Sequence, residues 1–223
     1  MKKLLLPFLL ILLASGMVAN NVIADNRFIL GSFERLTETS DAPFLGDNVS
    51  VESTLNGISG TLYLSQNDGF YSAIGLGHMV GDSDVCVQSN CASVDTKFTT
   101  FSCEIGWNLG KWIPFVGPTW TQAGGENTEV LLWDSENNLG HYPHIVVERS
   151  ADPFYLKIGL WLELDSFKVR GFLTGLDDSD TRGVSGAVLY QMENKFVVGA
   201  EFNVLLDSEA DGFRFSLQFG RSF

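Results

Sequence analysis

Hydrophobic and polar residues alternate along much of this chain. At its end, one face of an extended segment would carry Phe213, Phe215, Leu217, Phe219 and Phe223, and the other Arg214, Ser216, Gln218 and Ser222. A period of two residues predicts a β-strand. Because chain ends usually fray, a terminal strand with so apolar a face needs a surface that covers it.

The same period recurs upstream in segments of about nine to eleven residues, the length that a tilted membrane-spanning strand requires. The apolar rows are Ile58, Leu62 and Leu64; Phe70, Ile74 and Leu76; Phe101, Ile105 and Trp107; Leu156, Ile158, Leu160, Leu162 and Leu164; Phe167, Val169 and Leu173; Val184, Val188 and Tyr190; and Phe196, Val198, Phe202 and Val204. Residues 27–36 supply a further strand near the start. We expect ten strands, or eight if the weakest segments do not form strands.

The connections alternate between short and long, as in a meander. Short turns are expected at 66–68, 109–111, 165–166 and 193–194, and longer polar links at 80–96, 123–152, 177–181 and 206–211. This pattern favours an all-β, antiparallel, up-and-down transmembrane barrel over residues 25–223, with longer extracellular loops near 37–56, 80–96 and 123–152. Pro118 cannot donate to a ladder, so we expect the strand at 112–122 to bulge or to end early.

The N-terminus predicts export. Lys2 and Lys3 precede the apolar run "LLLPFLLILLASGMVA", and small residues at Ala19 and Ala24 offer two cleavage sites. We interpret residues 1–24 as a signal peptide, with a retained anchor helix as the alternative. Its removal takes the formal net charge from −13 to −15, which argues against nucleic acid as a partner. No later apolar run is long enough for a membrane-spanning helix.

The three cysteines fit an oxidising compartment. Cys86 and Cys91 bracket a polar segment and could close a small disulfide, while Cys103 follows a strand pattern and reads as a small apolar residue. The sequence offers no set of ligands with metal-site spacing, so we expect no metal and no cofactor.

Alternation alone does not say whether the apolar face meets lipid or a protein core. A soluble, lipocalin-like barrel that binds an apolar ligand shows the same period. The face opposite the apolar rows carries charges of both signs, which fit a barrel lumen in which they pair. We expect this lumen charge network to contain Glu104, Lys157, Glu163, Lys168, Arg170, Glu201 and Arg214. Tyr63, Tyr155 and Trp161 are expected inside as well, which favours a plugged lumen over a narrow pore.

The C-terminal residues Phe215, Leu217, Phe219 and Phe223 resemble the terminal strand by which bacterial outer-membrane barrels are recognised by their assembly machinery; Arg221 departs from that pattern at a position that is usually apolar. The segment "EIGWNLGKWIPFVGPTW", residues 104–120, is similar to hairpins of small OmpA-like and opacity-type barrels. The resemblance implies a barrel in the bacterial outer membrane, in contact with its lipid and lipopolysaccharide. It implies no single function, since such barrels include anchors, adhesins, pores and enzymes.

An enzymatic role has little support in the sequence. His78, His141 and His144 are candidate bases for a hydrolase at the barrel rim, but no Ser-His-acid set can be assembled from their spacing. We therefore expect a non-enzymatic barrel with a structural or surface-interaction role and an unidentified surface ligand.

Overall fold

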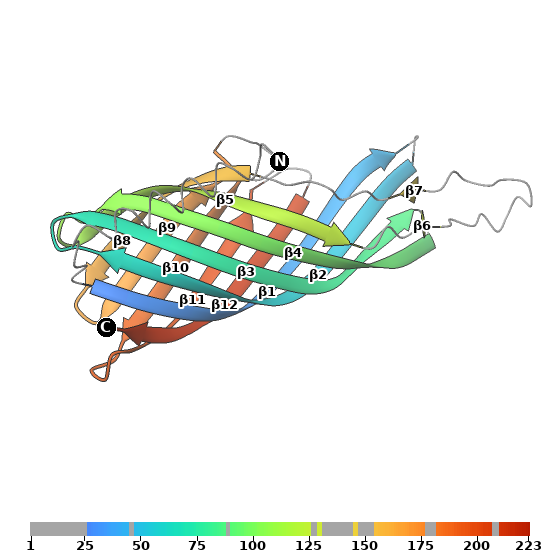
Figure 1. The fold of residues 1–223 in the computed structure, drawn as a ribbon. Helices are drawn as coiled ribbons and strands as arrows, with labels where there is room; N and C mark the ends of the chain where they lie inside the picture. The colour runs from blue at the N-terminus through green and yellow to red at the C-terminus, as the bar shows by residue number, and fades with distance from the viewer. Residues whose placement is uncertain are drawn as a thin grey trace, which may run out of the picture.

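The described part of the protein is all-β, and ten of its strands close into one barrel (Figure 1). The computed structural model describes residues 26–44, 47–87, 90–125, 129–130, 145–146, 154–176, 182–206 and 210–223. In these ranges, no helix has the length and apolar character needed to cross a membrane. The predicted signal peptide, residues 1–24, lies outside the described residues.

Ten antiparallel strands form the barrel wall, which confirms the predicted strand number. Their bounds are β1 Asn26–Phe44, β2 Asp47–Ser65, β3 Phe70–Val87, β4 Asn90–Trp107, β5 Trp112–Gly125, β8 Phe154–Leu164, β9 Phe167–Thr174, β10 Gly183–Gln191, β11 Phe196–Leu205 and β12 Ala210–Ser222. Strand β1 pairs with both β2 and β12, so the first and last strands close the sheet. Closure leaves the barrel without a free sheet edge at the level where all ten strands pair.

Four tight turns lie at one end of the barrel, here called the turn side, together with Asn26 and Phe223. They span residues 66–69, 108–111, 165–166 and 192–195. Each turn contains a residue with positive φ, namely Asp68, Gly110, Asp165 and Lys195, as tight hairpin connections commonly require. The opposite end is here called the loop side.

The outer surface of the barrel is apolar on every strand. Large hydrophobic side chains with exposed fractions of 42–61% include Phe33, Ile58, Leu76, Ile105, Val116, Ile158, Leu173, Val188, Phe202 and Leu217, one from each of the ten strands. Water would penalise such a continuous belt, whereas hydrocarbon accommodates it. The apolar rows therefore face lipid. The soluble, lipocalin-like alternative is wrong, because it required the opposite orientation.

Aromatic side chains border this belt on the turn side. Those exposed on the outer face next to the turns are Trp107, Trp112, Phe167, Tyr190, Phe196 and Phe223. Aromatic girdles of this kind mark the water interface of membrane barrels. The terminal Phe stripe of β12 thus faces lipid, with Phe223 at the interface.

Two predicted loops are strands, and those predictions were wrong. Residues 37–56 and 80–96 mostly continue β1 with β2, and β3 with β4, in an unbroken antiparallel register to 44↔47 and 87↔90. Above the lipid the outer face becomes polar while the inner face stays mixed, so the alternation disappears although backbone pairing continues. Strands β1 to β4 therefore extend past the ends of β8 to β12 (Figure 1). We call the part of these four strands with a polar outer face the loop-side wall, residues 35–56 and 80–97.

Most of the third predicted loop, 123–152, lies outside the described residues, as do His141 and His144. Within it, β5 continues to Gly125, and β6 Glu129–Val130 pairs with β7 Ile145–Val146. Pro118 neither bulges nor ends β5. Its partner Leu156 on β8 keeps register, while the pairing with β4 is interrupted at Gly117 and Pro118 and resumes in the same register.

Candidate functional site

The barrel lumen holds charged side chains from six strands. The seven residues predicted for the lumen charge network all carry inward-facing parity, and each of them takes part in an ion pair. They form three groups along the barrel axis. Lys168 with Glu163 lies nearest the turn side, Glu104 with Lys157, Arg170 and Glu201 lies in the middle, and Arg214 lies toward the loop side.

Glu104 on β4 is the centre of the middle group, which we call the floor cluster: Glu104, Lys157, Arg170 and Glu201. Its Oε1 atom accepts from Lys157 Nζ at 2.7 Å and from Arg170 Nη2. Arg170 Nη1 lies 3.8 Å from Glu201 Oε2. Glu104 is only 3% exposed and Arg170 5%, so each charge depends on its partners to offset the loss of hydration.

Ring hydroxyl and indole groups complete the hydrogen bonding of the floor cluster. Tyr71 Oη donates to Glu104 Oε2 at 2.7 Å, and Trp161 Nε1 donates to Tyr71 Oη at 3.0 Å. Arg170 Nη1 donates to Tyr63 Oη at 3.4 Å. Both oxygens of the buried carboxylate are thereby satisfied, as buried charges require.

An aromatic layer surrounds the floor cluster and fills the lumen on its turn side. It consists of Phe28, Tyr63, Tyr71, Phe115, Trp161 and Phe172. Phe28 stacks on Tyr63 at 4.4 Å between ring centroids, and Trp161 meets both rings edge-on. The Arg170 guanidinium lies 4.4 Å from the centroid of Phe172 and 4.8 Å from that of Phe115, in cation–π contact.

The aromatic layer depends on the absence of a side chain at Gly159 on β8. A Cβ there would lie 2.4 Å from Phe115 Cζ and 2.5 Å from Phe172 Cβ. The Phe115 ring and the Phe172 side chain therefore occupy the space that any other residue at this position would take. Gly159 lets these two side chains pack together beside Arg170.

On the loop side, Arg214 forms an ion pair with Glu34 of β1. Ser59 Oγ also donates to Glu34. Glu34 was missing from the predicted network, because the adjacent positions 34 and 35 both carry a charge, although only Arg35 faces outward. Its shared parity with Ser32 was the signal that could have identified it.

A cavity of about 380 Å³ lies above the floor cluster, which we call the lumen cavity. Its base is formed by Glu104, Lys157, Arg170, Phe172 and Glu201, and its side walls carry many hydroxyl groups. The wall residues with hydroxyls are Ser32, Ser59, Thr61, Thr100, Ser102, Thr119, Thr121, Tyr155, Thr174, Ser185 and Ser216. The described part of the lumen is thus filled on the turn side and hollow toward the loop side.

The remaining candidate residues lie outside the lumen. His78 is exposed on the outer face, and its Nδ1 lies 3.0 Å from Thr99 Oγ1, so its described partner is a hydroxyl rather than a carboxylate. Phe215, Leu217, Phe219 and Phe223 are exposed on the outer face of the barrel. Over the described ranges, no three His, Cys, Asp or Glu residues are placed to hold a metal ion.

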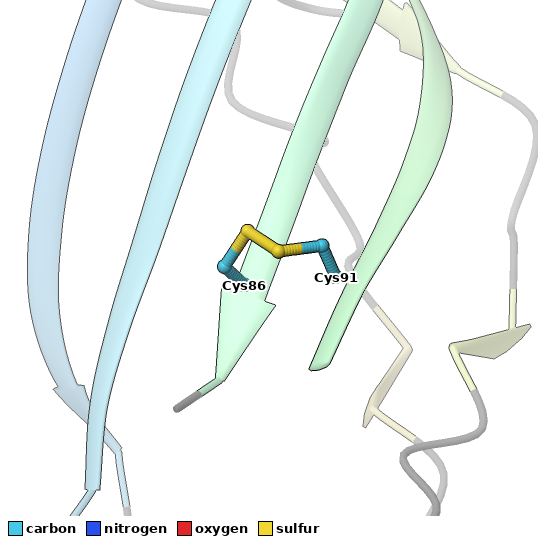
Figure 2. The surroundings of a disulfide bond; sticks show 2 residues. All are labelled: Cys86 and Cys91. Carbon is cyan, nitrogen blue, oxygen red and sulfur yellow. A yellow bond between two sulfur atoms is a disulfide. The ribbon is translucent and has the colours of Figure 1, made fainter. Parts of the chain in front are cut away.

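A disulfide joins Cys86 of β3 to Cys91 of β4 at the end of the loop-side wall, with 4.1 Å between the Cα atoms (Figure 2). The two residues are direct partners in the strand register. Cys103 is a free thiol and lies on the outer face of β4, in the same row as Ile74. The covalent link therefore ties the tip of the β3–β4 hairpin, well away from the lumen.

Comparison with known proteins gives structural neighbours only. No protein-family model matches the chain, and no curated protein matches it. Among solved structures, the chain is similar to Ail, the attachment invasion locus protein of Yersinia pestis, in complex with the heparin analogue sucrose octasulfate (9% identity, 89% of this chain and 98% of that chain, TM-score 0.43).

Two further neighbours come from Pseudomonas. The outer membrane protein OprG of Pseudomonas aeruginosa shares 10% identity over 90% of this chain and 96% of that chain, with a TM-score of 0.43. The COG4313 outer membrane channel of Pseudomonas putida F1 shares 11% identity over 88% of this chain and 95% of that chain, with a TM-score of 0.43. At such low identity we carry no residue role from these proteins to this chain.

Proposed function

We propose that this chain is a non-conducting β-barrel of the bacterial outer membrane, with a structural or surface-contact role and no enzymatic activity. The observation that carries the proposal is the filled turn side of the lumen, where the aromatic layer and the floor cluster lie across the barrel axis. A ten-strand barrel is narrow enough for its own side chains to fill it. Ions crossing it would have to displace buried rings and break buried ion pairs.

The loop-side wall supports a role in surface contacts. Strands β1 to β4 have 18 or 19 residues each, whereas about ten residues span a bilayer. The remainder extends toward the loop side and bears exposed acidic side chains at Glu52, Asp82, Asp84 and Asp95. With Asn26 and Phe223 both on the turn side, this wall faces the cell exterior in the usual orientation of such barrels.

The proposed partners follow from the two surfaces of the barrel. The apolar belt would contact outer-membrane lipid, and the rim above it would meet lipopolysaccharide headgroups. The exposed Phe215, Leu217, Phe219 and Phe223 would present the predicted recognition signal to the barrel assembly machinery.

Electrical recording from planar bilayers tests the proposal. The refolded mature barrel should give no steady current beyond that of the protein-free bilayer. The double variant Tyr63→Ala/Trp161→Ala removes two rings from the aromatic layer and should introduce a leak. A steady, reproducible conductance from the native barrel would contradict the proposal.

The outer face offers a matched control for the leak. Phe33 and Phe219 also form a ring pair, at 5.7 Å between centroids, but they lie on the lipid side. The variant Phe33→Ala/Phe219→Ala removes as many rings without touching the lumen, so it should remain as silent as the native barrel. Equal currents from both double variants would show that the leak comes from a general loss of barrel stability and not from the loss of the aromatic layer.

A further inference from the structure

The lumen cavity has the properties of a ligand site, and we propose that it binds a small, neutral, polyhydroxylated molecule of the size of a mono- or disaccharide. This goes beyond the proposed role in the envelope and does not depend on any partner of the loop-side wall. The cavity volume, about 380 Å³, lies in the lower part of the range typical of small-molecule pockets, about 300–1,000 Å³. Since the turn side is filled, a ligand would enter from the loop side.

Two side chains that line the cavity each carry a buried polar atom without a hydrogen-bond partner among the described residues. The atoms are Arg170 Nε, a donor, and Gln218 Oε1, an acceptor. Arg170 is 5% exposed, and both residues line the cavity. Buried polar atoms without partners are uncommon and costly. A ligand hydroxyl both donates and accepts, so it would suit either atom once the side chain turned toward the cavity.

The two atoms lie on either side of one carboxylate. Glu201 Oε2 accepts from Gln218 Nε2 at 3.3 Å and lies 3.8 Å from Arg170 Nη1. Arg170 and Gln218 thus reach the cavity from β9 and β12, with Glu201 of β11 linking them. The two side chains that carry the unpartnered atoms therefore belong to one connected group in the cavity lining.

The charges around the cavity favour a neutral ligand. Lys157 and Arg170 already share Glu104, and Arg214 is paired with Glu34. An anionic ligand would have to break one of these buried pairs or remain uncompensated, which is costly in a poorly solvated site. A neutral ligand leaves every pair in place.

The side walls match the two kinds of surface that a sugar presents. Ser and Thr hydroxyls from most of the strands provide donors and acceptors around the cavity, as the wall residues given above show. Apolar surface comes from Phe172 at the base and from Leu36, Met79, Phe98 and Leu205 near the loop side. Hydroxyl groups and the C–H face of a pyranose ring would each find complementary partners.

Saturation-transfer NMR on the refolded full mature barrel tests the proposal, with D-glucose and maltose as probes and lysine and glutamate as charged comparisons. Transfer to at least one sugar is expected, and weaker or no transfer to the two amino acids. Absence of transfer to both sugars, or preferential binding of lysine or glutamate, would overturn it.

Two glycines provide a matched pair of variants that locate the binding. Gly77 lines the cavity, and a Cβ there meets Ser59 Cβ at 3.3 Å. Gly60 lies on the neighbouring strand with outward parity, and a Cβ there meets nothing closer than 3.9 Å. Gly77→Leu should lower sugar affinity at least about tenfold by filling the cavity, whereas Gly60→Leu should leave it unchanged. Equal binding by both variants would place the sugar elsewhere and overturn the proposal.

A second variant covers the case in which Gly77→Leu fails to form a heat-modifiable barrel. Gln218→Leu keeps a similar side-chain volume but removes the unpartnered acceptor, so sugar affinity should again fall at least about tenfold. Undiminished affinity in this variant would contradict the assignment of Gln218 to the site.

Discussion

Glu104 accepts from Lys157, Arg170 and Tyr71 in a part of the lumen where little water reaches it. In such a setting the ion pairs need not stabilise the protein relative to apolar residues of the same shape. Removing one partner is different, because it leaves the opposite charges buried without compensation. The contribution of Glu104 is therefore best measured by its removal.

We predict that Glu104→Gln lowers the free energy of unfolding by about 3–5 kcal/mol, since Lys157 and Arg170 lose their shared counter-charge. Urea unfolding of the barrel in lipid vesicles measures the change. Glu52→Gln is the control, because Glu52 is exposed on the loop-side wall and its loss should change stability by no more than about 0.5 kcal/mol. Equal effects of the two variants would show that the floor cluster is not a stabilising unit.

At the scale of single strands, the length of a strand and the polarity of its outer face determine whether it only crosses the lipid or also extends beyond it. Strands β8 to β11 have 8 to 11 residues, enough to cross the lipid and little more. Strands β1 to β4 cross the same lipid and then continue with a polar outer face. A charge introduced on the outer face should therefore lower the stability of the barrel in the lipid-facing belt but not in the loop-side wall.

We predict that Leu160→Arg, in the middle of the outer face of β8, destabilises the barrel by about 2–4 kcal/mol, the cost of an arginine at the bilayer midplane. Thr54→Arg places the same side chain on the outer face of the loop-side wall, where water solvates it, and should be nearly neutral. The urea midpoint in vesicles and the shift in gel migration on boiling report both variants. Similar losses from both would contradict the assignment of the lipid boundary.

At the scale of the whole molecule, the barrel is asymmetric about the membrane. Both described ends of the chain and all four tight turns lie on the turn side, while the disulfide lies at the far end of the loop-side wall. Cys103, by contrast, lies on the outer face within the apolar belt. The disulfide and the Cys103 thiol therefore lie at different depths relative to the membrane.

Thiol labelling on intact cells can read this orientation. After mild reduction, a membrane-impermeant maleimide should label Cys86 and Cys91 and leave Cys103 unmodified, because lipid shields the Cys103 thiol. Cys86→Ser/Cys91→Ser should abolish surface labelling without loss of the heat-modifiable barrel. Labelling that appears only after cell lysis would place the loop-side wall in the periplasm and contradict the proposed orientation.

Parity along the strands was sufficient to predict much of the lumen. A period of two assigns each charged residue to one face regardless of its partners, so Glu104, Lys157 and Arg170 could be placed inside from the chain alone. The same reasoning failed for Glu34, where adjacent positions both carry charge, and for Phe115, where Trp112 and Pro114 make the opposite face equally apolar. It also failed for the loop-side wall, where polar residues on the outer face erased the alternation.

The sequence by itself determined the all-β class, the apolar stripe of each strand and the short turns, because each depends on residues adjacent along one strand or hairpin. It favoured ten strands over eight and lipid over a protein core as the surface that the stripe meets. Only the tertiary structure decided which lumen residues meet. Arg214 finds Glu34 across 180 residues of sequence, and Trp161 finds Tyr71 across 90. Such pairs, and the cavity above them, depend on how ten strands tilt and close, which strand periodicity does not encode.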